Sequence, residues 1–267
     1  MEVKSRYRPL LKWAGGKRWL LPTIEKLWLS YAGARYVEPF SGGAGVAFGL
    51  APRRALLNDS NAHLINFYAH VRRGLSLDIE LRYDEDLFYR QRDRFNSLVS
   101  NGGKRSAEAA QLFYYLNRTS FNGLCRFNSK GFFNVPFGKY KRVEYERDFI
   151  EYRSLLKRWK FVSLDFEELE IERGDFVYCD PPYCSSPGSA IFDRYTAGGF
   201  SWEDQVRLAE WLVRHRGPVL LSNQAEPRIV RLYRKLGFRL KFVNGPRRIS
   251  ANGARGFVRE VLASRNL

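Results

Sequence analysis

A short apolar segment that ends in Asp180-Pro181-Pro182-Tyr183 constrains the fold more than any other part of this chain. The segment, residues 175–179, reads DFVYC and follows Gly174. This pattern is typical of a buried parallel strand that ends in a turn. In open α/β sheets, ligands bind at the carboxyl ends of the strands. We therefore expect an α/β fold in which Asp180 and Tyr183 stand where a substrate binds.

The residue types of this motif suit methylation of an exocyclic amine such as that of adenine. The amine is a poor nucleophile because its lone pair is delocalised into the ring. Asp180 and the carbonyl of Pro181 can accept its two N–H bonds and localise the lone pair, and the prolines stiffen the segment. Tyr183 can stack on a flat ring. The amine could then attack a methyl sulfonium directly, although an ordinary Asp-Pro turn after a strand gives the same four residues.

Composition narrows the class of protein and its partner. The chain has 267 residues, enough for one domain or one domain with an insertion. It has no apolar run of membrane-spanning length and no signal-peptide core, and its three cysteines lack zinc spacing. We expect a cytoplasmic protein without a metal. The net charge of +17 favours a polyanionic partner. Charge alone does not distinguish among DNA, RNA and an anionic membrane. The alternative is that the charge only keeps the protein in solution.

A second candidate site element lies near the amino terminus. A short strand at residues 35–37 leads into a glycine loop, residues 38–45, and a helix at 46–50. Such a loop lets a ligand approach the backbone closely, but its spacing is not that of a nicotinamide or flavin dinucleotide site. The next strand, residues 55–57, ends near Asp59, which is placed to accept from ribose hydroxyls. A plain tight turn explains the loop nearly as well.

The middle of the chain contains two segments with different sequence patterns. Residues 61–118 have helical patterns, with Ser106 as a helix cap. Residues 116–142 interleave basic and aromatic side chains without an acid, and turn signals indicate a hairpin or loop. This mixture suits phosphate contacts and base stacking. The alternative is a solvated basic loop over a small aromatic cluster.

The remainder predicts the second half of the sheet. Small residues at 184–189 and 196–199 indicate a mobile lid. Ser201 caps a helix that runs to Arg214. We expect a strand at 218–222, a helix at 226–236 that ends at Gly237, and a terminal hairpin of residues 238–243 and 256–263.

Several blocks in this order resemble the DNA adenine methyltransferase (Dam) family. They are residues 12–17, 38–43, 58–59, 122–128, 134–138 and 178–183. The resemblance implies a Rossmann-like, S-adenosylmethionine-dependent methyltransferase sheet with a mainly helical target-recognition insert that carries a β-hairpin. It implies a catalytic domain of residues 1–60 and 147–267 and a DNA-binding domain of residues 61–146. The implied reaction is methylation of adenine N6 in duplex DNA, at GATC, after the base is flipped out.

The resemblance also assigns roles to residues. The catalytic motif is Asp180, Pro181, Pro182 and Tyr183. The cofactor S-adenosyl-L-methionine is expected against Trp13, Lys17, Glu38, Phe40, Ser41, Gly42, Gly43, Asp59, Asp165, Phe166 and Asp180. DNA is expected against Lys12, Arg118, Phe121, Asn122, Leu124, Arg126, Asn128, Pro136, Lys139 and Tyr140. Lys12 would contact the first guanine, Leu124 and Arg126 the second half of the site, and Phe121 and Asn122 the space left by the flipped adenine.

The chain departs from the family pattern at a few positions. Phenylalanine replaces a common tyrosine at 121 and 127, lysine replaces a common arginine at 139, and Arg248 replaces a serine in a late motif. These changes weaken the GATC assignment more than the chemistry. We expect a monomer on duplex DNA in the nucleoid, in restriction, repair or gene regulation.

Other functions compete with this interpretation. Some rRNA methyltransferases and protein glutamine methyltransferases carry a similar Pro-Pro-aromatic motif, but the basic insert argues against them. Cytosine-C5 chemistry needs a nucleophilic Pro-Cys pair, which the chain lacks. A catalytically silent DNA-binding module would need neither the glycine loop nor Asp180, and cofactor binding separates it from an enzyme.

Overall fold

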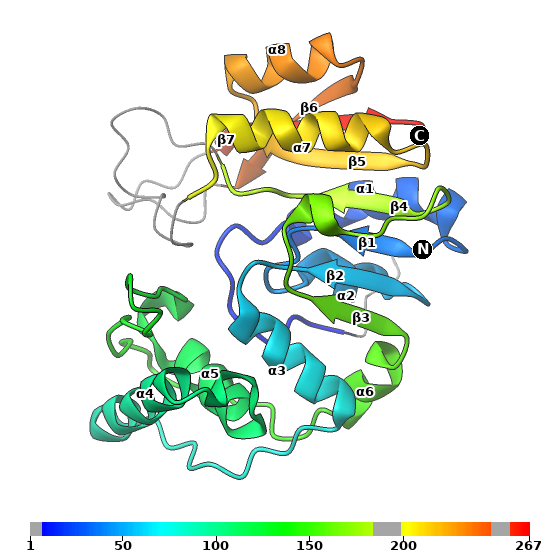
Figure 1. Cartoon of the computed structure of the whole chain (residues 1–267). Helices are drawn as coiled ribbons and strands as arrows, with labels where there is room; N and C mark the ends of the chain where they lie inside the picture. The colour runs from blue at the N-terminus through cyan, green and yellow to red at the C-terminus, as the bar shows by residue number, and fades with distance from the viewer. Residues whose placement is uncertain (1–6, 184–198, 247–256) are drawn as a thin grey trace.

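The molecule is built on one seven-stranded sheet in the strand order β3-β2-β1-β4-β5-β7-β6 (Figure 1). The computed structural model describes residues 7–183, 199–246 and 257–267. Strands β3, β2, β1, β4 and β5 pair in parallel, and β7 runs antiparallel between β5 and β6. The strands are β1 Tyr36–Glu38, β2 Ala55–Asn58, β3 Trp159–Val162, β4 Phe176–Cys179, β5 Val219–Gln224, β6 Arg239–Pro246 and β7 Phe257–Arg265. The order reverses between β1 and β4, so a crevice is expected beyond their carboxyl ends.

Alternate residues of the buried strands serve two cores, one on each face of the sheet. Tyr36 and Tyr178 belong to the core that includes α1, α2 and α3, whereas Val37 and Val177 belong to the core under α7 and α8. This division follows from the two-residue period of a strand. The helices are α1 Leu21–Trp28, α2 Gly45–Leu50, α3 Ala62–Arg73, α4 Glu85–Ser100, α5 Ala107–Thr119, α6 Ile150–Leu156, α7 Trp202–Arg214 and α8 Pro227–Lys235.

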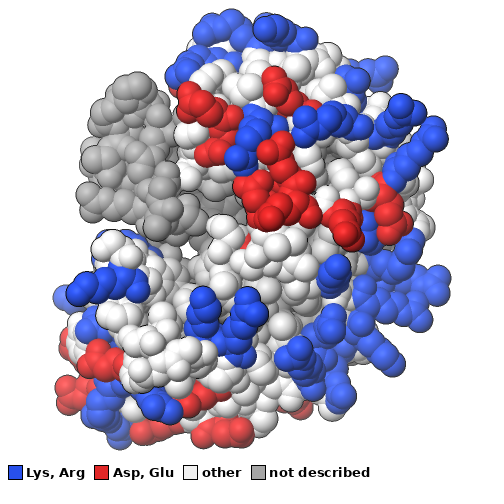
Figure 2. All heavy atoms as spheres, in the orientation of Figure 1, with Lys and Arg blue, Asp and Glu red and all other residues white. Residues whose placement is uncertain are grey.

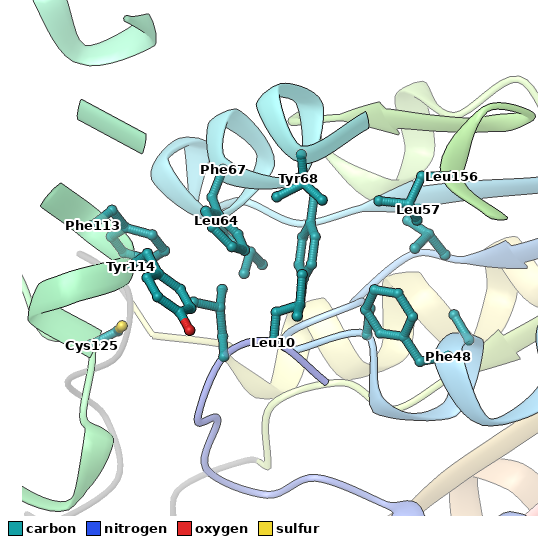
Figure 3. Packing of buried hydrophobic residues seen from close by; sticks show 14 of the residues in the cluster. Leu10, Phe48, Leu57, Leu64, Phe67, Tyr68, Phe113, Tyr114, Cys125 and Leu156 are labelled. Carbon is teal, nitrogen blue, oxygen red and sulfur yellow. The ribbon is translucent and has the colours of Figure 1, made fainter. Parts of the chain in front are cut away.

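The first core extends without interruption from the sheet into the helical insert. Figure 3 shows Phe48 and Leu57 near the sheet, and Phe67 of α3 beside Tyr114 of α5. The rings of Phe67 and Tyr114 stack with centroids 5.5 Å apart. Each fully buried side chain of this kind stabilises the fold by about 1.5–3 kcal/mol. Helix α3, the first helix of the insert, packs against both the sheet and α5, and this fixes the position of the insert relative to the sheet.

Most of the predicted elements are confirmed. Ser106 caps α5 by accepting from the Ala109 N–H at 3.1 Å, Ser201 forms a capping box at α7, and Gly237 follows α8 with φ +77°. The predicted terminal hairpin is β6 paired with β7. The sequence analysis did not predict α1, α6 or the edge strand β3.

The predicted β-hairpin of the insert takes a less regular form. Residues 126–134 reverse direction, and the Asn134 N–H donates to the Arg126 carbonyl at 3.1 Å. Phe127 and Phe133 form an isolated antiparallel bridge, and Ser120 and Phe137 form another. No continuous strand forms between residues 120 and 148, a part that the structure describes throughout. Side-chain hydrogen bonds and aromatic packing hold this reversal in place of a strand ladder.

Some predictions fall outside the described residues. The lid predicted at 184–189 and 196–198 and the late motif at 247–250 lie there. Across the described ranges, no helix is both long and apolar enough to cross a membrane.

Candidate active site

Asp180 directly follows β4, at the carboxyl end of the sheet, as predicted. Its Oδ1 accepts from the Ser222 hydroxyl at 2.9 Å and lies 3.2 Å from the Lys17 Nζ. Burial raises the pKa of Asp180, while Lys17 and the Ser222 hydrogen bond act to lower it. Burial acts to lower the pKa of Lys17, but Asp180, Tyr183 and Glu260 outweigh it, so the net pKa is raised. Lys17 is therefore a charged ammonium at neutral pH, held against the Asp180 carboxylate.

Tyr183 contributes a hydroxyl as well as a ring. Lys17 donates to this hydroxyl, which in turn donates to Glu260 Oε1 at 3.0 Å. Burial raises the pKa of Tyr183. The sequence analysis assigned Tyr183 only a stacking ring, so the structure adds a fixed orientation for that ring.

The backbone of the motif is supported from behind by a buried amide network. The Gln205 side-chain amide of α7 donates to the Pro182 carbonyl at 2.8 Å. Asn223 donates to Gln205 Oε1 at 3.0 Å and to the Tyr233 hydroxyl at 2.9 Å. Both amide side chains are buried, so these bonds exchange little with water. The network holds the Pro-Pro segment against α7.

The glycine loop lies next to Trp13 and Asp59. Gly42 has φ +47°, and a Cβ there would lie 2.7 Å from the Trp13 ring, so only glycine fits. The Gly42 N–H donates to Asp59 Oδ2 at 2.8 Å, and the Asn61 N–H donates to Oδ1 at 2.9 Å. Asp59, predicted to accept from ribose, thus also ties the loop to the start of α3. Each carboxylate oxygen keeps a second lone pair for a ligand.

Four carboxylates and one ammonium gather around the loop. Burial is the main cause that raises the pKa of Glu38 and of Asp59. The nearby Asp180 raises the pKa of Glu38 further. Lys17 is the cation that contacts Asp180 and Glu260. This acidic cluster stands out in a chain of net charge +17. Its charge suits a cationic ligand.

Four further predicted cofactor residues follow β1 and β3, two after each strand. The rings of Phe40 and Phe166 lie 5.7 Å apart and give this side an apolar wall. Asp165 begins the short helix η5, Phe166–Glu168, and its Oδ2 pairs with Arg207 at 2.6 Å. In Figure 2, acidic side chains gather over η5 and α7 on this face. Ser41 is also in the loop, where its N–H donates to the Asn58 carbonyl at 2.8 Å.

Lys12 joins the amino-terminal segment to the insert. Its N–H and carbonyl both bond the Asn117 side chain, at 2.8 Å each. Its ammonium donates to the Arg118 carbonyl at 2.9 Å and lies 3.6 Å from the centre of the Tyr140 ring. Burial, with a contribution from Arg118, lowers the pKa of Lys12 to about 8. Gly123 packs directly on the Lys12 side chain, so the amino-terminal segment and the insert meet here.

Phe121 and Asn122 project from the end of α5. Phe121 is 46% exposed, unusual for a large apolar side chain, and Asn122 is exposed at φ 53°. The Phe121 N–H donates to the Pro136 carbonyl at 2.9 Å, which anchors the short helix η4, Phe121–Gly123. Leu124, the next predicted DNA residue, is half-buried beside it. An anchored exposed ring is available to stack on a base.

The reversal at residues 126–134 is stabilised by residues that were predicted to touch DNA. Arg126 donates to Asn134 Oδ1 at 2.8 Å and to the Asn134 carbonyl at 3.1 Å. Asn128 Oδ1 accepts from the N–H groups of Lys130 and Phe132, each at 3.0 Å. Asn128 therefore shapes the turn. Arg126 is held in place with further guanidinium donors available.

The remaining predicted DNA residues surround this surface. Pro136 and Lys139 are exposed. Tyr140 donates its hydroxyl to the Ser120 carbonyl at 2.7 Å, and Arg118 donates to the Glu144 carbonyl at 2.8 Å. Tyr140 thus acts as a support for Lys12 in the free protein.

The sequence analysis missed Ser222, Gln205, Asn223 and Glu260. Ser222 and Asn223 follow an apolar run at the end of a predicted strand, the same signal that singled out Asp180. Glu260 lies on a strand with an ordinary alternating pattern, so its position gave no local signal. Only the pairing of β7 beside β5 brings it to the site.

The strand order defines a Rossmann-like α/β protein, and the site lies at the carboxyl ends of its parallel strands. The family model of the D12 class N6 adenine-specific DNA methyltransferases matches residues 13–248. The chain belongs to this family, and it is an adenine-specific DNA methyltransferase.

Curated relatives agree over nearly the whole chain. The type II methyltransferase M1.LlaDCHI of Lactococcus lactis subsp. cremoris is 36% identical to this chain, and the alignment covers 98% of this chain and 96% of the relative. A DNA adenine methylase of Vibrio cholerae is also 36% identical, over 97% and 96%. The type II methyltransferase M.MjaIII of Methanocaldococcus jannaschii is 35% identical, over 95% of each chain.

Proposed function

We propose that this enzyme transfers a methyl group from S-adenosylmethionine to adenine N6 in duplex GATC, after flipping the adenine out of the helix. The observation that carries the proposal is the convergence of Asp180, Tyr183 and the glycine loop at one sheet edge, with the exposed Phe121 and Asn122 on the adjoining insert. The proposed division is a catalytic domain of residues 1–60 and 147–267 and a DNA-binding domain of residues 61–146. We place its activity on the nucleoid, as a monomer.

The acidic cluster suits S-adenosylmethionine, which supplies an electrophilic methyl group on a positively charged sulfonium. The carboxylates of Glu38, Asp59 and Asp180 favour a cation. Phe40 and Phe166 offer an apolar wall for a flat ring. Trp13, Ser41 and Gly43 line the loop, and the second lone pairs of Asp59 can accept from hydroxyl groups.

Asp180 is arranged to hold the target amine. In the described part of the chain, its side-chain contacts fall on Oδ1, so Oδ2 is left to accept from the amine. The Pro181 carbonyl is the second proposed acceptor, and the ring of Tyr183 stacks on the base. Because these groups are fixed before the substrate binds, they act by preorganisation.

A flipped base requires something to occupy the space it leaves. Phe121 and Asn122 are exposed side chains on an anchored turn, which suits that role. Lys12 and Arg126, held by Asn117 and Asn134, are the proposed guanine contacts, because fixed cationic donors read guanine O6 and N7 in the major groove.

The test is methylation of duplex DNA in vitro, followed by nucleoside mass spectrometry and mapping of modified sites. We expect N6-methyladenine at GATC. N4-methylcytosine as the sole product, or transfer to RNA alone, would contradict the proposal. Methylation of adenine in other sequences would retain the chemistry and reject the site.

A further inference from the structure

Glu260 lies inside the active-site cluster although no motif includes it. It stands on β7 and is only 6% exposed. Its Oε1 accepts from the Tyr183 hydroxyl at 3.0 Å and lies 3.4 Å from the Lys17 Nζ. Its Oε2 is buried and has no hydrogen-bond partner among the residues that the structure describes. A buried carboxylate is costly unless charge or hydrogen bonds compensate it, so its presence here calls for a reason.

Lys17 is shared among three acceptors. Its ammonium donates to the Tyr183 hydroxyl and forms ion pairs with Asp180 Oδ1 and Glu260 Oε1. Removing any of them leaves the ammonium free to move toward the others. The position of Lys17 relative to Asp180 therefore depends on Glu260.

We infer that Glu260 is a positioning residue for methyl transfer, which acts through Lys17 and Tyr183. Its carboxylate draws Lys17 to one side of Asp180 and holds the Tyr183 hydroxyl. This arrangement keeps Lys17 on Asp180 Oδ1, so that Oδ2 faces the target amine, and it fixes the ring that stacks on the base. The inference rests on the proposed function.

The charge of Glu260 is what distinguishes positioning from packing. Burial raises the pKa of Glu260, Lys17 opposes that rise, and Asp180 adds to it. Two carboxylates that share one ammonium titrate as a coupled pair. The facing residues of β5 and β6, Gln224 and Val243, carry no charge. The titratable groups that face Glu260 are Lys17, Tyr178, Asp180 and Tyr183.

Glu260→Gln tests the inference because it keeps the shape and removes the charge. Asp180 then has the Lys17 ammonium to itself, which favours the ionised form of Asp180, so its pKa falls. We expect the acid limb of kcat to move to lower pH, and kcat at its plateau to fall roughly 10-fold to 100-fold through misplacement of the reacting groups. Glu210→Gln on the exposed surface of α7 is the matched control, and we expect it to change neither.

A second readout does not depend on activity. The Asp180 Cγ resonance, assigned with Asp180→Asn in carboxyl-labelled protein, should titrate at lower pH in Glu260→Gln than in the unsubstituted enzyme. Glu260→Asp keeps the charge and should restore the original midpoint while kcat stays reduced. It serves as the test variant if Glu260→Gln does not fold.

The inference requires both effects. An unchanged Asp180 midpoint overturns it, even if kcat falls, because the side chain is then only a packing group. An unchanged kcat overturns it as well. If the unsubstituted enzyme transfers no methyl group to adenine, the proposed function fails by itself, and the Asp180 resonance still decides whether Glu260 is coupled to the motif.

Discussion

At the scale of single residues, the carboxylates of the site differ in which of their oxygens already contact other groups of the protein. Asp180 has its contacts on Oδ1, from Lys17 and Ser222. Asp59 uses both oxygens to hold backbone N–H groups. The first arrangement leaves a whole oxygen for a substrate, and the second leaves single lone pairs. Asp180 therefore suits direct contact with the reacting amine, and Asp59 suits a supporting contact to the cofactor.

Replacing Asp180 with alanine should nearly abolish methyl transfer. The substitution removes a preorganised acceptor, which costs roughly a hundredfold or more in rate. DNA binding should persist because the cationic residues proposed to contact DNA lie elsewhere. Single-turnover kinetics and fluorescence anisotropy measure the two effects. Ser222→Ala, which keeps the carboxylate and its contact to Lys17, should lose much less, and near-normal turnover of Asp180→Ala would show that Asp180 only shapes a turn.

Lys12 should make DNA binding depend on pH. Its pKa is lowered to about 8, so it is charged below that pH and loses its proton as the pH rises through 8. If binding requires the charged form, affinity falls by up to about tenfold for each pH unit above the pKa. Anisotropy with a GATC duplex between pH 7 and 9 measures this. The Lys12→Met variant should bind more weakly with little pH dependence; a slope equal to that of the unsubstituted protein would exclude Lys12.

Site residues can be predicted from the sequence when the pattern that marks them lies in their own segment of the chain. Asp180 and Tyr183 follow a buried strand directly, so a local pattern suffices. Glu260 and Lys17 are far apart in sequence and meet only because β7 inserts beside β5. No local pattern carries that information.

At the scale of elements, the glycine loop depends on Gly42. Alanine there would place a Cβ 2.7 Å from the Trp13 ring at φ +47°. We expect Gly42→Ala to weaken S-adenosylmethionine binding, measured by calorimetry, because strain and overpacking of this kind cost about 1–3 kcal/mol. Duplex binding should be kept. Gly33→Ala, where a Cβ meets nothing within 4 Å, is the control, and equal cofactor affinity in both variants would show that the loop does not border the cofactor.

Variants in the reversal at residues 126–134 can distinguish recognition of a base from stabilisation of the turn. Arg126→Ala should cost about 1–3 kcal/mol on GATC and relax discrimination at one base pair. Because Arg126 also bonds Asn134, the Asn134→Ala variant is the control for a loosened turn. Methylation of GATC and of singly altered sites distinguishes them. Equal losses on every sequence for both variants would mean that Arg126 only stabilises the turn.

Helices and strands whose ends carry cap or turn residues could be predicted from the sequence. Elements that lack such residues could not. The caps of α5 and α7 and the Gly237 turn follow from short-range hydrogen bonding. Helix α1 has no side-chain cap, and β3 is an edge strand with only its first residue buried, so neither gives a strong pattern. The insert's reversal lacks ladder strands because side chains such as Asn128 satisfy its backbone groups.

At the scale of the whole molecule, two electrostatic environments are kept apart. The chain carries a net charge of +17, with Lys and Arg spread over the face in Figure 2, yet carboxylates cluster beside the end of β4. Exposed cations attract DNA, and buried carboxylates suit a cationic methyl donor. The two ligands should therefore respond differently to salt, since screening acts mainly on exposed charges.

Raising the salt concentration should weaken DNA binding steeply and leave S-adenosylmethionine binding nearly unchanged. A protein that neutralises 6–10 phosphates loses about 10³–10⁵ in DNA affinity between 50 and 200 mM salt. Lys141→Ala, which removes an exposed cation next to the aromatic residues of the insert, should make that slope shallower by about one unit on every duplex alike. Calorimetry for the cofactor and anisotropy for DNA, at the same salt concentrations, give both slopes. If cofactor affinity falls as steeply as DNA affinity, the acidic cluster is not where the methyl donor binds, because a buried site is shielded from the salt that screens the surface.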